Sequence, residues 1–296
     1  FAPPRCMSPS RQWPLARRAV AFTACLSMQG AVPSSLGHAT RAHTVHAGPF
    51  KVLFCDTSFA NCREALERQL ASVPAVQVQV CDRSEVASAM ADVHVAVPLM
   101  VRLDASVLAG ASQLQLIHQW GVGLEGVDIA AATARGVHVC RVPADSSYNA
   151  ISTAEHALHL LLSVLKCAKR THAAFQNRLL GLPTTEALYG KRVVLFGFGH
   201  VGREITKRLR PFGCQVAAVR QSTVWPESDR RLLDAMATFG TESAAKLIQE
   251  ANVIVLCCHL TPTNMGMVDR RFLALARPGL VLVNIARGPL LDYDAV

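Results

Sequence analysis

The chain has 296 residues, of which 51% are hydrophobic and 17% are charged. This apolar content suffices for a sizeable core, which excludes a disordered or fibrous protein, and the length suggests about two domains. The formal net charge is +9, but five arginines and no acidic residue lie in the first 50 residues. The other 246 residues hold 25 basic and 21 acidic ones, an ordinary balance that argues against a nucleic-acid partner.

The first 49 residues are rich in Ala, Ser and Arg and contain no acidic residue, a composition typical of an organelle transit peptide. We predict a disordered leader at residues 1–49 that directs the protein to a plastid or a mitochondrion; otherwise the protein is expected to be cytoplasmic. A secretory signal and an extension without a targeting role are the alternatives. The apolar run from Ala19 to Val32 is too short to span a bilayer, so no membrane partner is expected.

The ten cysteines include no C-x-x-C pair, which argues against a disulfide scaffold. Cys257 and Cys258 are adjacent at a predicted strand end, and we interpret them as structural rather than as a metal or redox pair. His156 and His159 have no evident third ligand. The sequence therefore predicts no metal site.

From Lys51 onward, short β-rich runs alternate with helical patterns, which predicts an α/β fold with parallel sheets. A first domain is expected at residues 50–146, with strands at 51–55, 76–80, 92–97, 114–120 and 137–142. A long helix from about Ala150 to Arg178 is expected next, because apolar residues recur there every three or four positions. It belongs to a second domain that covers residues 147–296.

The second domain contains a strand, a glycine turn and a helix in direct succession. The strand is predicted at residues 191–196, and Gly197, Gly199 and Gly202 form the pattern G-x-G-x-x-G before a helix that ends near Gly213. In this context the first glycine permits a tight turn, the second lets the backbone approach a pyrophosphate, and the third allows close packing of helix on strand. The motif therefore predicts a dinucleotide site at the helix N-terminus.

The residues after the next strand, predicted at 215–219, bear on the choice of cofactor. NAD sites usually place a carboxylate there to accept from the ribose 2′-hydroxyl, but this chain has Arg220 and Ser222, and no carboxylate before Glu227. An arginine with neighbouring hydroxyls suits a 2′-phosphate. We therefore predict NADP as the favoured cofactor and NAD as the alternative. Without such a ligand, Arg220 would be an exposed, solvated side chain.

Three motifs occur in the same order as in one known family: GFGHVG at 197–202, HLTPTN at 259–264 and VNIARG at 283–288. Together with residues 121–143, they resemble the D-isomer-specific 2-hydroxyacid dehydrogenases, which include phosphoglycerate dehydrogenase and hydroxypyruvate and glyoxylate reductases. The resemblance covers roughly residues 50–296. It implies a flavodoxin-like substrate domain, a Rossmann cofactor domain, a homodimer, and hydride transfer between a nicotinamide and a small 2-hydroxy or 2-oxo acid.

The resemblance also implies roles for individual residues. Arg287 matches the catalytic arginine that binds the substrate carboxylate and polarises the oxo group, on whose oxygen hydride addition builds negative charge. The backbone of Val122, Gly123 and Leu124 matches the loop that receives the substrate carboxylate. Cofactor contacts are implied for His200 and Val201 at the pyrophosphate and, near the nicotinamide, for Cys258, Ile285 and Ala286.

One part of the family pattern has no match here. The family's general acid is a His oriented by a Glu, both downstream of the Arg motif, and the sequence ends nine residues after Arg287. We therefore expect a Rossmann domain truncated at its C-terminal end, and a chain that is inactive by itself because it lacks the general acid. The alternatives to an enzyme are a non-catalytic dinucleotide-binding interaction protein and an inactive paralogue of the same fold.

Overall fold

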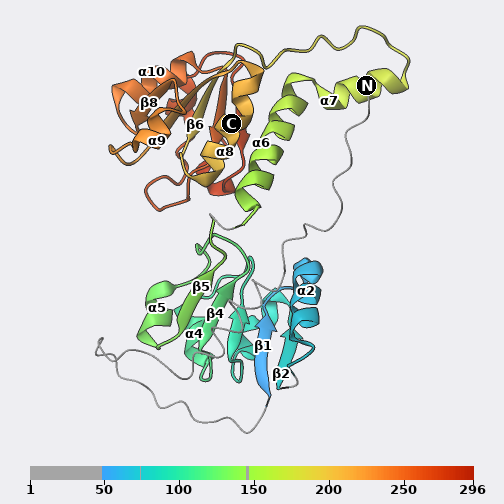
Figure 1. Cartoon of the computed structure of the whole chain (residues 1–296), viewed down its shortest axis with the longest axis vertical. Helices are drawn as coiled ribbons and strands as arrows, with labels where there is room; N and C mark the ends of the chain where they lie inside the picture. The colour runs from blue at the N-terminus through green and yellow to red at the C-terminus, as the bar shows by residue number, and fades with distance from the viewer. Residues whose placement is uncertain (1–48, 74, 145–146) are drawn as a thin grey trace. The chain divides into compact units, whose positions relative to one another are not determined.

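The computed structural model describes residues 49–73, 75–144 and 147–296. They divide into two compact units, the first ending at Arg141 and the second beginning at Val142 (Figure 1). The predicted boundary between the domains lies a few residues further on, between residues 146 and 147. Apart from Pro49, the predicted leader at residues 1–49 lies outside the described residues.

The first unit is built on a parallel sheet of five strands in the order β2-β1-β3-β4-β5, the order of flavodoxin-like folds. The strands are β1 (Phe50–Phe54), β2 (Val76–Val80), β3 (Val95–Val97), β4 (Leu116–Gln119) and β5 (His138–Arg141). All five were predicted. β3 and β4 are shorter than expected, because pairing with their neighbours covers only these residues.

Four helices accompany this sheet: α2 (Ala60–Leu70), α3 (Val86–Ala89), α4 (Ala105–Gly110) and α5 (Ile129–Ala134). Aspartates begin two of them, since Asp104 accepts hydrogen bonds from the first-turn amides of α4 and Asp128 from one in α5. Successive residues of β1 point to opposite faces of the sheet, so that Leu53 belongs to one apolar cluster and Phe54 to another. Both faces of the sheet are therefore covered, which explains the nearly continuous apolar runs in its strands.

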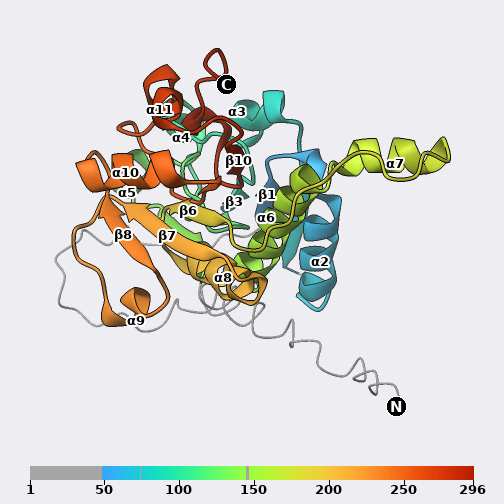
Figure 2. The ribbon, with the colours of Figure 1, turned by 90° about the horizontal axis from the view of Figure 1, so that it is seen from above.

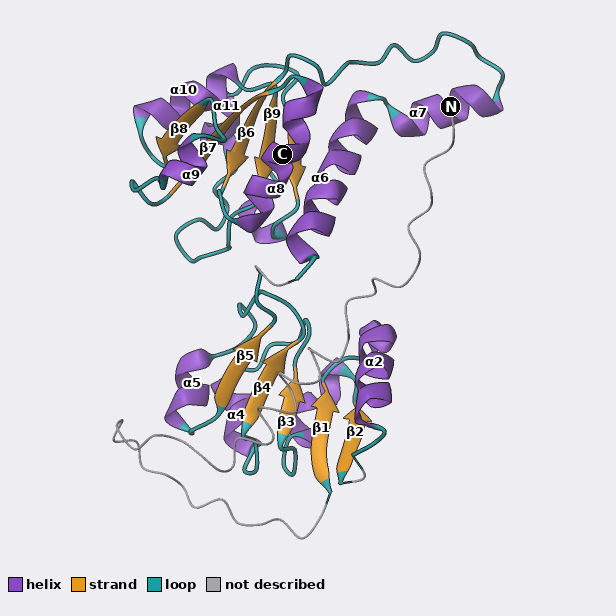
Figure 3. Ribbon diagram, in the orientation of Figure 1, coloured by secondary structure: helices purple, strands orange, loops and turns teal. Residues whose placement is uncertain are grey.

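The second unit repeats this architecture with the strand order β10-β9-β6-β7-β8, again all parallel (Figure 3). The strands are β6 (Arg192–Phe196), β7 (Gln215–Arg220), β8 (Ala235–Thr238), β9 (Val253–Leu256) and β10 (Val281–Asn284). The helices are α6 (Asn149–Leu165), α7 (Ala168–Gln176), α8 (His200–Leu209), α9 (Glu227–Arg230), α10 (Glu242–Glu250) and α11 (Arg270–Leu275). Numbered within the unit from β6, this is the order 3-2-1-4-5 of a Rossmann fold, which confirms the predicted fold class.

The prediction of one continuous helix at residues 150–178 is wrong. The segment forms α6 and α7, which are separated at Cys167, where the backbone is left-handed with φ +48°. Figures 1 and 2 show α7 projecting away from the sheet of its own unit. Buried residues recur along α6, whereas Ala174 is the one buried residue of α7, so only α6 is held by packing.

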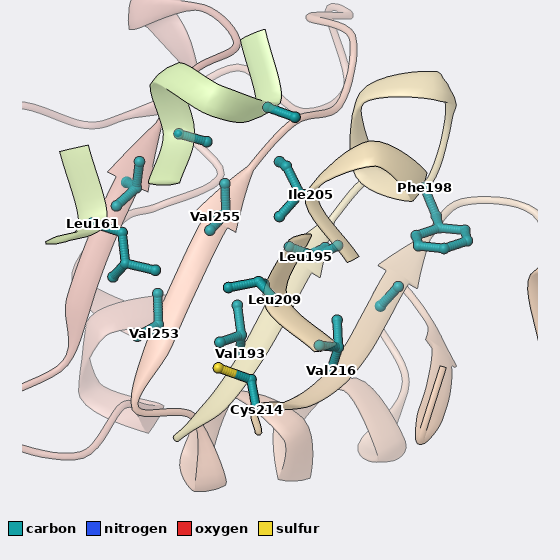
Figure 4. Packing of buried hydrophobic residues seen from close by; sticks show 14 of the residues in the cluster. Leu161, Val193, Leu195, Phe198, Ile205, Leu209, Cys214, Val216, Val253 and Val255 are labelled. Atoms are coloured by element: carbon teal, nitrogen blue, oxygen red, sulfur yellow. The ribbon is translucent and has the colours of Figure 1, made fainter. Parts of the chain in front are cut away.

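Packing of α6 and α8 on one face of the second sheet forms its largest apolar cluster (Figure 4). Val193 and Leu195 of β6 point toward Ile205 and Leu209 of α8, and Leu161 of α6 belongs to the same cluster. The opposite face packs against α10 and α11. In this way β6 and α8 are fixed on both sides of the glycine turn that joins them.

Among the residues that the structure describes, no helix combines the length and the apolar character that crossing a membrane requires.

Candidate functional site

The carboxyl ends of neighbouring strands in the second unit meet at one edge of the sheet. The register aligns the last residues of β6, β7 and β9, so Gly197, Arg220 and Cys257 lie at the same edge. Ligands of open α/β sheets bind at this edge, where the strand order reverses.

Gly197 occupies a position that no side chain fits. Its φ is +101°, and a Cβ on it would lie 2.7 Å from both the backbone nitrogen and the Cα of Cys258. The thiol of Cys257 donates a hydrogen bond to the carbonyl oxygen of Gly197 over 3.0 Å. Burial raises the pKa of this thiol far above its usual range, so it stays protonated and ties the glycine turn to the end of β9.

The other two glycines of the motif differ in their surroundings. Gly199 is the N-cap of α8 without a side-chain cap, and a Cβ on it would meet nothing within 4 Å. The space before the helix is therefore open, and His200 and Val201 present first-turn amides that have no partner within a helix. Such a helix end favours an anion. A Cβ on Gly202, in contrast, would lie 3.0 Å from the carbonyl oxygen of Gly197, so Gly202 serves close packing.

A cavity connects the glycine turn with the end of β7. It is lined mostly by apolar side chains, with two amide residues and one cationic residue: Phe196, Gly197, Val219, Arg220, Gln221, Phe239, Cys258, Asn264 and Met267. Apolar walls with a few placed polar groups are typical of cofactor sites. The open end of α8 and this cavity thus fit a dinucleotide, with its pyrophosphate at the helix and its adenosine toward β7.

The side chain of Arg220 is fixed by neighbouring groups and is not solvated as a free surface arginine would be. Its guanidinium carbon lies 4.1 Å from the ring centroid of Trp225, and its Nη1 lies 3.7 Å from Oδ2 of Asp229. Its Nε donates to the carbonyl oxygen of Ser222 over 3.4 Å. The side chain is 17% exposed. The hydroxyl of Ser222 accepts from the amide of Val224 over 3.1 Å, and Ser222 does not line the cavity.

Arg287 follows β10, the strand next to β9. Asn284 orders this turn: its Oδ1 accepts from the amide of Ala286 over 3.0 Å and its Nδ2 donates to the carbonyl of Arg287 over 2.8 Å. The Arg287 side chain is exposed and donates from Nη1 to the carbonyl of Ala286 over 2.9 Å. Ile285 packs against the apolar core of this unit. The turn therefore presents a cation at the same edge of the sheet as the glycine motif.

The loop after β9 is ordered by Asn264, which is 7% exposed. Its Oδ1 accepts from the amide of Thr261 over 2.7 Å and its Nδ2 donates to the carbonyl of His259 over 2.8 Å. Cys258 lines the cavity, and burial raises the pKa of its thiol. Within the described parts of the chain, no three His, Cys, Asp or Glu side chains cluster as a metal site requires.

The predicted substrate loop lies in the first unit, after β4. In the described residues, the amides of Val122, Gly123 and Leu124 donate no backbone hydrogen bond. The carbonyl of Val122 accepts from Nη1 of Arg141 over 3.2 Å, and Leu124 packs on the core of this unit. Neighbouring amides without internal partners are donors that suit a carboxylate.

Sequence reasoning missed the residues that support these groups. Trp225 and Asp229 hold Arg220, while Asn264 and Asn284 order the loops after β9 and β10. A tryptophan five residues beyond the strand end was the available signal for the first pair. The two asparagines had a weaker signal, since asparagine is common in turns of every kind.

Comparison with known proteins supports the family predicted from the motifs. The D-isomer specific 2-hydroxyacid dehydrogenase, NAD binding domain, matches residues 158–296. The chain is 34% identical over 228 residues to the D-3-phosphoglycerate dehydrogenase of Mycobacterium leprae, across 75% of this chain and 41% of that protein. The chain belongs to the D-isomer-specific 2-hydroxyacid dehydrogenases.

A second family member, the glyoxylate reductase of Thermococcus gammatolerans, is 31% identical over 211 residues, which are 67% of this chain and 59% of that protein. The chain thus spans between about two fifths and three fifths of the length of these two relatives. The crystal structure of D-lactate dehydrogenase from Aquifex aeolicus, complexed with NAD and lactic acid, has a TM-score of 0.71 at 21% identity. The match covers 83% of this chain and 71% of the D-lactate dehydrogenase chain. This likeness shows that the two proteins share a fold.

Proposed function

We propose that this chain is the dinucleotide- and substrate-binding part of an oxidoreductase that transfers a hydride between a nicotinamide cofactor and a small 2-hydroxy or 2-oxo acid. The observation that supports this most directly is the shared sheet edge, with the open N-terminus of α8 after β6 and Arg287 after β10. The bound nicotinamide supplies or accepts the hydride. The chain's own contribution is to hold the pyrophosphate and to place a guanidinium near the reacting oxygen.

The proposed role of Arg287 follows from the charge that forms in the reaction. Reduction of a 2-oxo acid builds negative charge on the carbonyl oxygen, and a planar guanidinium can contact this oxygen and the carboxylate together. The amides of Val122, Gly123 and Leu124, which donate no backbone hydrogen bond within the described residues, are also proposed as carboxylate donors. Names of the two relatives point to glyoxylate and to 3-phosphoglycerate as members of the substrate class to test.

NADP is the proposed cofactor of choice, with NAD as the alternative. The support for NADP is Arg220, which lines the cavity at the end of β7, where an NAD site usually has a carboxylate. The nearest carboxylate, Asp229, also pairs with Arg203, with distances of 2.7 Å and 3.0 Å to its two oxygens. Two guanidinium groups and one carboxylate leave a net positive charge for a 2′-phosphate.

Binding measurements test the proposed function without requiring turnover. NADPH, NADH and then glyoxylate in the presence of oxidised cofactor are titrated against the chain. We expect NADPH to bind more tightly than NADH, and glyoxylate to bind only after the cofactor. Dinucleotide binding without any response to 2-oxo acids would instead support a non-catalytic dinucleotide-binding protein. Failure to bind either dinucleotide would contradict both.

We also propose a homodimer. Large apolar side chains are exposed in and after α7: Phe175 at 82%, Leu180 at 97% and Tyr189 at 80%. Figures 1 and 2 show that α7 projects from its unit, so this segment offers apolar surface that a second copy could cover.

Import into a plastid or mitochondrion remains our proposal from the composition of residues 1–49. Fusing these residues to a fluorescent protein tests it directly. Fluorescence that stays in the cytoplasm would contradict import.

A further inference from the structure

Arg220 and Trp225 form a stacked pair beside the cavity at the end of β7. The guanidinium carbon of Arg220 is 4.1 Å from the ring centroid, close enough for a cation–π contact. Trp225 itself is only 9% exposed and packs against Phe198, with 6.1 Å between ring centroids. The tryptophan is therefore fixed by the core, and it offers Arg220 one rigid face.

A second guanidinium lies beside this pair. Arg203 of α8 places its guanidinium carbon 5.8 Å from the ring centroid of Phe198 and binds the fully buried carboxylate of Asp229 with two hydrogen bonds. Asp229 holds the pKa of Arg203 above its usual value. Arg203 is thus the closer partner of Asp229, whereas Nη1 of Arg220 lies 3.7 Å from Oδ2 of Asp229.

We propose that Trp225 is a specificity-determining positioning residue for the cofactor. It holds the guanidinium of Arg220 in one plane, so that the free edge of this group faces the ribose 2′-position. Arg203 neutralises Asp229, so that the positive charge of Arg220 is available to the 2′-phosphate. This inference rests on the proposed preference for NADP. The physical reason is preorganisation, because a guanidinium already stacked on a ring loses less side-chain freedom when it binds a phosphate.

The geometry explains why each part is needed. A flexible arginine at a strand end would pair with the nearest carboxylate, and Asp229 would then cancel its charge. The tryptophan face and the Arg203 pair together limit this pairing to a 3.7 Å contact, since the first fixes the plane of Arg220 and the second donates a hydrogen bond to each oxygen of Asp229. Selectivity for the 2′-phosphate should therefore depend on two residues that do not themselves touch the phosphate.

The test uses two soluble probes that differ only in the 2′-phosphate, adenosine 2′,5′-bisphosphate and adenosine 5′-monophosphate, titrated calorimetrically against the 296-residue chain. The readout is the ratio of the two affinities, which a general loss of structure would not change selectively. We expect Trp225→Leu to lower this ratio about threefold to tenfold, the range of a cation–π contact. Trp225→Phe should restore part of it.

A double-mutant cycle separates positioning from folding. In an Arg220→Gln background the ratio is already low, and Trp225→Leu should lower it no further. Arg203→Gln tests the second half of the inference: Asp229 then loses the two hydrogen bonds from Arg203 and can pair more closely with Arg220, so the ratio should fall although Arg220 is unchanged. Arg231→Gln is the matched control, because Arg231 is exposed and pairs with Glu227 on the surface.

The outcomes distinguish the inference from the proposal beneath it. A native chain that binds both probes equally would contradict the preference for NADP and, with it, this inference. A native chain that prefers the bisphosphate, together with Trp225→Leu and Arg203→Gln variants of unchanged ratio, would leave that preference intact and overturn the inference alone.

Discussion

A Cβ on Gly197 would lie 2.7 Å from the Cα of Cys258, so the glycine turn after β6 and the residues after β9 approach each other too closely for any side chain between them. Gly199, two residues later, faces open space. The two glycines of one motif therefore have different requirements. The first is needed by the fold and the second by the ligand.

This contrast predicts opposite effects of the same substitution. Gly197→Ala should lower the free energy of unfolding by about 1–3 kcal/mol, because the residue would combine a positive φ with a backbone clash. Gly199→Ala should change stability by less than about 0.5 kcal/mol but weaken NADPH binding roughly tenfold by obstructing the pyrophosphate. Urea unfolding and dinucleotide titration of both variants check this. Equal stability of the two variants would contradict it.

Replacing Arg287 should weaken binding of the 2-oxo acid and leave binding of the dinucleotide unchanged. In Arg287→Gln, glyoxylate binding in the presence of oxidised cofactor should weaken by about tenfold to a hundredfold, the effect of losing a charge-assisted hydrogen bond. Dinucleotide affinity should stay within about twofold of the native value, since a 2-oxo acid and not the cofactor needs the cation. Arg271→Gln, an exposed arginine on α11, is the control. A variant that binds glyoxylate as well as the native chain would remove Arg287 from the proposed site.

Arg220 should decide between the two dinucleotides. Arg220→Gln is expected to weaken NADPH binding by about tenfold to a hundredfold and to leave NADH binding almost unchanged, because only the 2′-phosphate needs the charge. Gln is a better test than Asp, because a second carboxylate beside the buried Asp229 would destabilise the loop. The measurement is a fluorescence titration with each cofactor. An equal loss for both cofactors would mean that Arg220 acts through structure.

A carboxylate in the first unit should make that unit sensitive to acid. Asp56 is buried, which by itself raises its pKa, but hydrogen bonds from Ser58 and from Arg83 outweigh this and the pKa is lowered from 3.8. A lowered folded-state pKa stabilises the fold above the unfolded-state value. This stability is lost as the pH falls below about 4 toward the folded-state pKa.

Asp56→Asn should therefore destabilise the chain at neutral pH by about 1.5–3 kcal/mol, the usual contribution of hydrogen bonds to a charged group, and by less at pH values near 3. Urea unfolding across this pH range measures both effects. The control is Asp292→Asn, near the other end of the described chain. A constant difference between Asp56→Asn and the native chain at every pH would contradict the assignment.

The proposed dimer predicts that a charge on the exposed apolar segment separates the copies. Phe175→Glu should shift the chain from dimer to monomer, because burying an unpaired carboxylate in an interface is unfavourable. Ile129→Glu, at a residue that is 47% exposed in the first unit, should leave the dimer intact. Sedimentation measurements distinguish the two. A native chain that sediments as a monomer would contradict the dimer itself.

Much of the fold was predictable from the sequence because its signals are local. Strands buried on both faces are continuous apolar runs, and the residues of β6 and β9 show this directly. Gly213, which ends the segment after α8 with φ +69°, is likewise a local requirement. The strand β8 (Ala235–Thr238) had no such signal, since its sequence AMAT has no run of β-branched residues, and it is a strand because it pairs with β7.

By itself, the sequence determined the two α/β units with parallel sheets, the glycine turn and the positions of Arg220 and Arg287 at or after the ends of their strands. These features follow from periodicity and backbone preference, which act over a few residues. Only the tertiary structure decided what surrounds these groups. It breaks the expected long helix at Cys167, and it brings Trp225 and Asp229 to Arg220 from beyond the strand and Arg203 from the preceding helix. Those contacts arise when α8, α9 and β7 pack together, and no local pattern along the chain encodes that arrangement.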